Sequence, residues 1–99
     1  MLQLFIELAK RLQDANLDDV TVTLTESDPS DNCSARIDID APLVIARITC
    51  WETGDYVAEV IDLATEKTIY SSQGLLQKDE IMEDHFSSFF KSIDSKLNL

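Results

Sequence analysis

The sequence predicts an α+β fold: an antiparallel β-meander of four to five strands, with an N-terminal and a C-terminal helix packed on one face. Three observations lead to this prediction. Apolar residues recur at helical spacing near both ends of the chain, and they alternate with polar residues in between. Short links join the alternating segments, which favours antiparallel neighbours. Only two Gly and two Pro occur among 99 residues, so regular elements should dominate one domain over residues 1–99.

The N-terminal helix is predicted over "MLQLFIELAKRLQD", ending near residues 14–16. Its acidic residues, and the lack of a basic leader, argue against a secretion signal. No apolar run approaches the roughly 20 residues that span a bilayer. The apolar positions form one broad stripe, which favours burial against a sheet. They are Leu2, Leu4, Phe5, Ile6, Leu8, Ala9 and Leu12.

Two strands are predicted next, in "DDVTVTLTES" and "SARIDID", because apolar and polar residues alternate in both. The intervening "SDPSDN" is predicted to be a turn, in which Pro29 restricts φ and neighbouring Asp, Ser and Asn side chains cap backbone groups. Pro42 marks the connection that follows, since it has no N–H to donate to a ladder.

A hairpin is predicted from strands at about 43–51 and 55–63, joined at "ETGD". Gly54 suits such a turn because it adopts positive φ without steric cost. The segment "ATEK" then leads to a short last strand, "TIYSS". From about Gln77 the spacing becomes helical, with acidic residues first and Lys91 and Lys96 near the end, as the helix dipole favours. The apolar stripe of this predicted helix consists of Ile81, Met82, Phe86, Phe89, Phe90, Ile93 and Leu97.

Two helices cover only one face of such a sheet, and we assign them to the face of Val22, Ile37, Ile48, Ala58 and Val60. The other face is then left open. Its large apolar groups beside arginine resemble the centre of a protein interface. We therefore predict a partner-binding surface, with Glu52 in the adjoining turn. Its residues are Arg36, Asp38, Arg47, Thr49, Trp51, Glu52, Val57, Glu59 and Ile61.

Two other interpretations of this face stay open. Arg36, Asp38, Arg47 and Glu59 could pair across strands and form an ordinary solvated face. Trp51 could instead pack under a loop or the C-terminal tail, or the strand register could be shifted by one residue.

The net charge of −11 is the unusual feature of the composition, with 19 acidic against 8 basic residues and a pI near 4.2. Such a charge repels nucleic acid and anionic membranes and attracts basic partners, although a soluble acidic protein without such a partner would also carry it. Cys33 and Cys50 form no Cys-x-x-Cys pair, which indicates a reducing cytoplasm.

Little in the sequence indicates catalysis. His85 is the single histidine and lies beside two phenylalanines, which favours a structural role. Asp38 and Asp40 have the spacing of an Asp-x-Asp metal pair, but simple strand alternation explains them. No nucleophile elbow or phosphate-binding loop is present. We predict a protein that is not an enzyme and has no cofactor and no metal.

The segments "IDID", "ARITCWETG" and "AEVIDLATEK" resemble the TriTu family of bacterial immunity proteins, most strongly over residues 37–67. The layout of helix, meander and helix is also similar. The resemblance implies an antidote to a polymorphic toxin of the Rhs or contact-dependent kind, namely an ADP-ribosyltransferase effector that modifies elongation factor Tu. Inhibition would follow from binding at the NAD or target-docking cleft of that toxin.

This resemblance predicts a 1:1 complex with a cognate toxin domain of basic character, and no nucleic acid or membrane partner. Two alternatives are a chaperone or adaptor for a secreted protein, and a small ADP-ribosyl hydrolase. The hydrolase would require Asp38, Asp40 and Glu59 to meet in one cleft.

Overall fold

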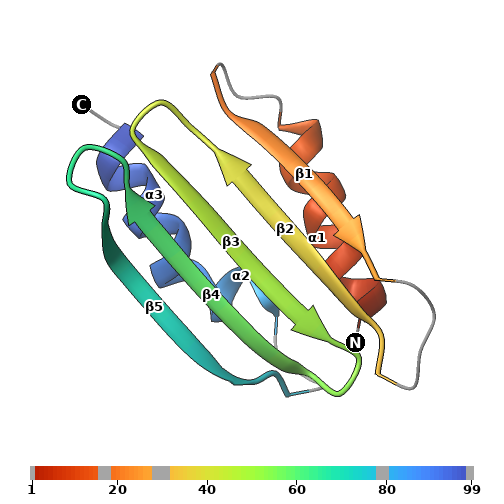
Figure 1. Ribbon diagram of the computed structural model, residues 1–99. Helices are drawn as coiled ribbons and strands as arrows, with labels where there is room; N and C mark the ends of the chain where they lie inside the picture. The colour runs from red at the N-terminus through yellow and green to blue at the C-terminus, as the bar shows by residue number, and fades with distance from the viewer. Residues whose placement is uncertain (1, 16–18, 28–31, 78–80, 98–99) are drawn as a thin grey trace.

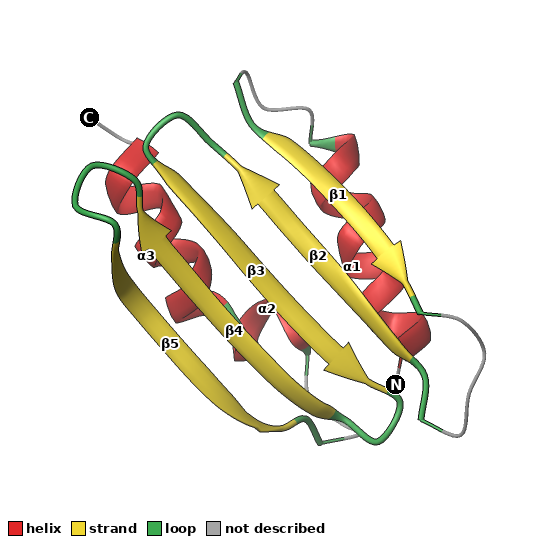
Figure 2. Ribbon diagram, viewed as in Figure 1, coloured by secondary structure: helices red, strands yellow, loops and turns green. Residues whose placement is uncertain are grey.

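The computed structural model describes residues 2–15, 19–27, 32–77 and 81–97, with side chains described as far as residue 93. Five strands form one sheet in the order β1-β2-β3-β4-β5, and every neighbouring pair is antiparallel (Figures 1 and 2). The predicted α+β meander is therefore confirmed. The elements are α1 (Leu2–Asp14), β1 (Thr21–Glu26), β2 (Ser34–Asp40), β3 (Val44–Trp51), β4 (Asp55–Asp62), β5 (Lys67–Leu75), α2 (Met82–His85) and α3 (Ser87–Leu97).

The described helices lie on one side of the sheet, α1 behind β1 and β2 and α3 behind β3 to β5 (Figure 1). The core forms between these layers. Ile37, Ile48, Ala58 and Val60 are fully buried there, as predicted. Val22 is only half-buried because β1 is an edge strand, which fewer side chains cover. None of the helices in the described ranges is long and apolar enough to cross a bilayer.

The β3–β4 hairpin decides which side chains reach each face. Gly54 has φ 99°, its N–H donates to the Trp51 carbonyl at 2.8 Å, and its carbonyl accepts from Leu76 at 2.9 Å. A residue with a Cβ is strained at that φ. The turn thus sets the pairing of β3 with β4, in which Arg47 lies opposite Glu59.

The prediction of a short last strand over "TIYSS" is wrong. Strand β5 runs on to Leu75, because residues 71–75 continue to pair with β4 up to the hairpin. The segment "QGL" lacks the alternation that marks a strand, and its pairing depends on the neighbouring β4. An irregularity between Val60 and Ile61 sets Tyr70 against Val60 and Thr68 against Ile61.

The prediction of one C-terminal helix beginning near Gln77 is also wrong. Helices α2 and α3 are separated at Phe86, whose ψ of 16° departs from helical values. The break lets one apolar stripe continue along both helices, so that Met82, Phe86, Phe89 and Ile93 are all buried. Ile81, assigned to that stripe, precedes α2 and is 63% exposed. The predicted turn at residues 28–31 lies outside the described residues.

Candidate partner-binding face

The side of the sheet away from the helices, which we call the open face, is covered by none of the described helices (Figure 1). Strand alternation and the observed register arrange its side chains in rows across the strands. Given from β1 to β5, the rows are Thr21, Asp40, Ile45, Ile61 and Thr68; then Thr23, Asp38, Arg47, Glu59 and Ser71; then Thr25, Arg36, Thr49, Val57 and Gln73; and last Ser34 beside Trp51, and Asp55 beside Leu75.

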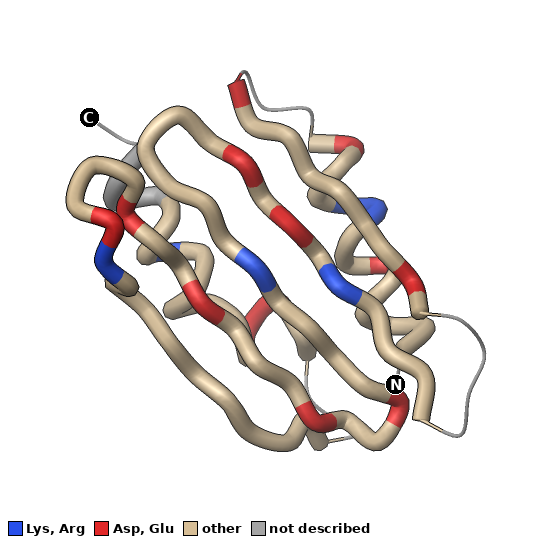
Figure 3. The backbone as a smooth tube through the Cα atoms, in the orientation of Figure 1, with Lys and Arg blue, Asp and Glu red and all other residues tan. Residues whose placement is uncertain are grey.

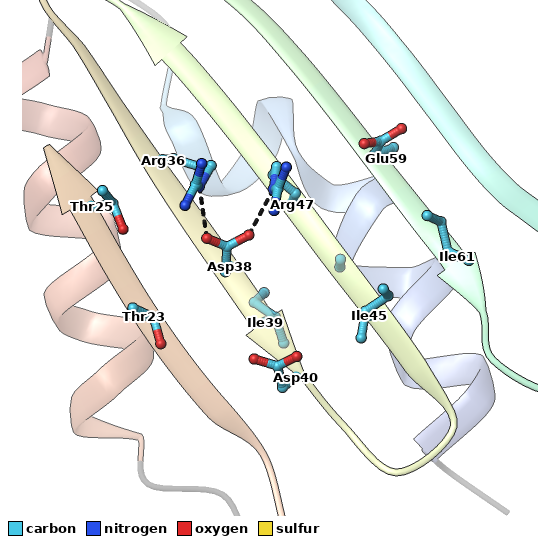
Figure 4. Close-up of a pocket in the computed structure, with 11 residues that line it drawn as sticks. Thr23, Thr25, Arg36, Asp38, Ile39, Asp40, Ile45, Arg47, Glu59 and Ile61 are labelled. Atoms are coloured by element: carbon cyan, nitrogen blue, oxygen red, sulfur yellow. Dashed lines mark hydrogen bonds and ion pairs between the residues drawn. The ribbon is translucent and has the colours of Figure 1, made fainter. Parts of the chain in front are cut away.

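An ion-pair cluster of Arg36, Asp38 and Arg47 occupies the centre of this face. The Nε–H of Arg36 donates to Oδ2 of Asp38 at 2.8 Å, and the Nε–H of Arg47 donates to Oδ1 at 2.7 Å (Figure 4). The predicted pairing across strands is thus confirmed for these three residues. Glu59 faces Arg47 from β4 but forms no ion pair within 4.0 Å with any described residue.

The two arginines control the charge state of Asp38. Partial burial is the largest single influence and raises the pKa of this carboxyl, but the hydrogen bonds and charges of Arg47 and Arg36 together outweigh it, so the pKa is lowered overall. The hydrogen bond that Arg47 donates to Asp38 in turn raises the pKa of Arg47. Asp38 and Arg47 are therefore both charged at neutral pH.

Apolar side chains lie at both ends of the ion-pair cluster. At one end Ile45 and Ile61 are cross-strand partners, and Ile45 is 38% exposed. At the hairpin end Val57 is 39% and Leu75 52% exposed. Trp51 points to the open face as predicted, but it is half-buried and not bare. The open face thus combines a charged centre with apolar ends.

A shallow hollow of about 380 Å³ lies over β1 to β4. The cluster forms part of its wall, together with the hydroxyls of Thr23 and Thr25 (Figure 4). Asp38, Asp40 and Glu59 all line it, as a hydrolase would require. However, Asp38 is held by two guanidiniums and its pKa is lowered, so it is a poor general acid or base near neutral pH.

The structure places the other predicted interface residues around the cluster and hollow. Thr49 lies beside Arg36 in one row and is half-buried. Glu52 lies in the exposed turn after β3, where its carboxylate accepts from the Leu2 backbone N–H at 3.4 Å. This contact ties the turn to the start of α1, so Glu52 borders the open face and does not lie on it.

Sequence reasoning missed Ile45, Leu75 and the two threonines Thr23 and Thr25 on this face. The period of two could have identified Ile45, since it has the same parity as Arg47 and Trp51. The threonines also alternate, but exposed residues are ordinary on an edge strand, so the pattern does not mark Thr23 and Thr25 as binding residues. Leu75 lies in the part of β5 whose strand character no local pattern indicates.

The remaining candidate groups are structural. His85 contacts Tyr56 and Phe86 edge to face, with ring centroids 4.9 and 5.1 Å apart. Burial raises the pKa of the Cys50 thiol to about 11, which keeps it protonated and unreactive at neutral pH. Within the described ranges no three His, Cys, Asp or Glu side chains are placed to hold a metal ion.

The charge pattern of the open face is uneven. In Figure 3 two basic segments lie side by side on β2 and β3, with acidic segments on β2 and β4 around them. Among the described residues in the rows of the open face, only Arg36 and Arg47 are basic. Asp40, Asp55 and Glu59 are the nearby acids, so this face presents a basic centre within acidic surroundings.

A protein-family model described as immunity protein TriTu matches residues 4–92 of the chain. The matched range includes all five strands, the ion-pair cluster and the exposed apolar residues at both of its ends. No curated protein matches the chain.

Proposed function

The chain belongs to the TriTu family of immunity proteins, and from that premise we propose that it neutralises its toxin stoichiometrically, by binding through the open face. Membership of the family gives a toxin as the partner. The binding surface, the stoichiometry and the way in which the toxin is blocked are the proposal.

The observation that carries the proposal is a sheet layer with a helical cover on one side only. The open face exposes Ile45, Val57 and Leu75 by 38–52% beside a polar centre. Exposed apolar groups next to polar residues mark surfaces at which proteins bind one another. Trp51 and Arg47 supply the residue types that contribute most to binding at such surfaces.

The partner we propose is a basic toxin domain bound 1:1. The net charge of −11 accelerates association with a basic surface. Cys33 and Cys50 form no Cys-x-x-Cys pair, which supports a reducing cytoplasm as the place of action.

The toxin itself is proposed to be an Rhs-type ADP-ribosyltransferase, delivered by type VI secretion and acting on elongation factor Tu. The support for this step is the resemblance of "IDID", "ARITCWETG" and "AEVIDLATEK" to the family. Bound at the NAD or target-docking cleft, the immunity protein would exclude the substrate without any turnover of its own.

The test is surface-plasmon measurement of toxin binding by Trp51→Ala and Arg47→Ala. Truncating a central interface residue costs about 2 kcal/mol, so each variant should bind about 30-fold more weakly. Ile81→Ala and Lys10→Ala are matched controls, since they remove an exposed apolar and an exposed basic group from α2's start and from α1. Both controls should bind like the wild type.

Val57→Gln is a second open-face variant, which tests the interface even if Trp51→Ala does not fold. Val57 is 39% exposed, so its replacement leaves no cavity in the core. Circular dichroism checks the fold of every variant. Unchanged dissociation for all open-face variants, with folded proteins, would remove this face as the interface. Binding of an unfolded toxin segment but not of the folded domain would instead indicate a chaperone.

A further inference from the structure

The ion-pair cluster leaves part of each arginine unused. Arg36 and Arg47 each donate Nε–H to one oxygen of Asp38, and the described residues accept no other side-chain hydrogen bond from either guanidinium. The two side chains are 42% and 50% exposed, whereas that of Asp38 is 21% exposed. The Nη end of each guanidinium, which has the geometry to grip a carboxylate with two parallel hydrogen bonds, is thus available to a partner.

The charges of the cluster do not balance. Two guanidiniums hold one carboxylate, so the three hydrogen-bonded residues carry one more positive than negative charge, while Glu59 on β4 acts on Arg47 without a direct ion pair. Asp38 also orients both arginines on neighbouring strands, so that they are held in place before any partner arrives. Holding the side chains in advance lowers the entropy lost on binding.

We propose that Arg36 and Arg47 together bind one carboxylate, an Asp or Glu side chain on the toxin surface that docks on the open face. This inference rests on the proposed function. The incoming carboxylate completes an alternating arrangement of two guanidiniums and two carboxylates, with Asp38 on the inner side and the toxin side chain on the outer side.

The surroundings favour a carboxylate over a phosphate group. Asp40 and Glu59 line the same hollow, and a group with two negative charges would be repelled by them more strongly than one with a single charge. A carboxylate carries a single negative charge, which equals the excess positive charge of the three hydrogen-bonded residues. Thr23 and Thr25 offer hydroxyls at the β1 side of the hollow that are able to donate to the same oxygens.

This arrangement makes the cluster a selectivity device. The overall negative charge draws basic surfaces to the protein, but a surface that is basic at every point would place positive groups against Arg36 and Arg47 on docking. Repulsion of that kind discriminates between partners as effectively as added attraction. The cognate toxin should therefore carry one acidic residue within an otherwise basic docking surface.

The test uses the double variant R36K/R47K, which keeps both charges and loses the planar fork. We expect its affinity for the toxin domain to fall at least 10-fold, with the fold intact by circular dichroism. The matched control is Arg11→Lys, the same chemical change at the exposed ion pair between Arg11 and Glu83, which join at 2.8 Å on the helical side. Its affinity should not change.

The partner group is then identified by neutralising each toxin Asp and Glu singly, as Asn or Gln. One such toxin variant should lose affinity as the double lysine variant does, and the two changes combined should add little further loss. The inference would be overturned if R36K/R47K bound the toxin with wild-type affinity, or if no toxin Asp or Glu were coupled to the two arginines. If Trp51→Ala still lost affinity for the toxin in that case, the open face would remain the proposed interface. Competition by millimolar inorganic phosphate would show a phosphate site instead, and a wild-type protein that binds no toxin would overturn both proposals.

Discussion

At the scale of single residues, register decides which charges meet. Arg47 has Asp38 and Glu59 as cross-strand neighbours, and either could be its partner by sequence. The structure pairs it with Asp38, which Arg36 reaches from two residues away on the same strand. The sequence reasoning placed all of these residues on one face. It left open which of them pair, because side-chain geometry depends on the twist and spacing of the strands.

Asp38→Asn should lower the free energy of unfolding by about 1 kcal/mol at pH 7, since it removes a partly exposed double ion pair. The folded-state pKa of Asp38 lies below the ordinary value of 3.8, so its stabilising effect is present above about pH 4 and is lost as the pH falls through the lowered pKa. Urea unfolding at pH 7, 5 and 3 checks this. The difference between wild type and variant should be constant from pH 7 to 5 and shrink at pH 3; a difference of equal size at all three pH values would contradict it.

At the scale of elements, helical spacing predicts Met82, Phe86, Phe89 and Ile93 of the C-terminal apolar stripe correctly, but it wrongly includes Ile81 and does not predict the division into two helices. Phe86 and Phe89 are buried, and the chain departs from helical geometry at Phe86 so that both reach the sheet. Phe86 meets Tyr56 at a centroid distance of 5.1 Å and Phe89 meets Tyr70 at 6.0 Å. Helical spacing predicts which side of a helix is buried. It does not predict the shape of the sheet surface against which that side packs.

Phe89→Ala should destabilise the protein by about 3–5 kcal/mol, the usual cost of emptying a fully buried phenylalanine site. Phe90→Ala is the matched control, because the neighbouring ring is only half-buried and its loss should cost clearly less. Chemical denaturation of both variants measures the difference. Equal destabilisation by the two substitutions would mean that the packing of α3 differs from that described.

At the scale of the whole molecule, charge and architecture act together. One side of the sheet forms the core with the helices, which leaves the other side open, and we propose that the toxin binds there. The electrostatic field of the net charge of −11 reaches into the solvent and is screened over about 10 Å at 0.1 M salt. The field therefore acts on the approach of a partner, while short-range contacts at the open face act on its departure.

If the toxin is basic, its association rate constant should fall about 10-fold or more between 50 and 500 mM NaCl. The dissociation rate constant should change much less, because buried contacts are weakly screened. Stopped-flow fluorescence of Trp51, the single tryptophan, follows both rates. An association rate that is independent of salt would show that charge steering plays no part.

The sequence by itself determined the fold class, the faces of the strands and the hairpin at Gly54, because alternation, helical spacing and the conformational freedom of glycine act locally. The same alternation brought Arg36, Asp38, Arg47 and Trp51 to one surface. Only the tertiary structure decided the length of β5, the break at Phe86, the half-burial of Trp51 and the joint grip of two arginines on Asp38. Each of these depends on residues far away in the chain, whose distance and orientation are set when the layers pack.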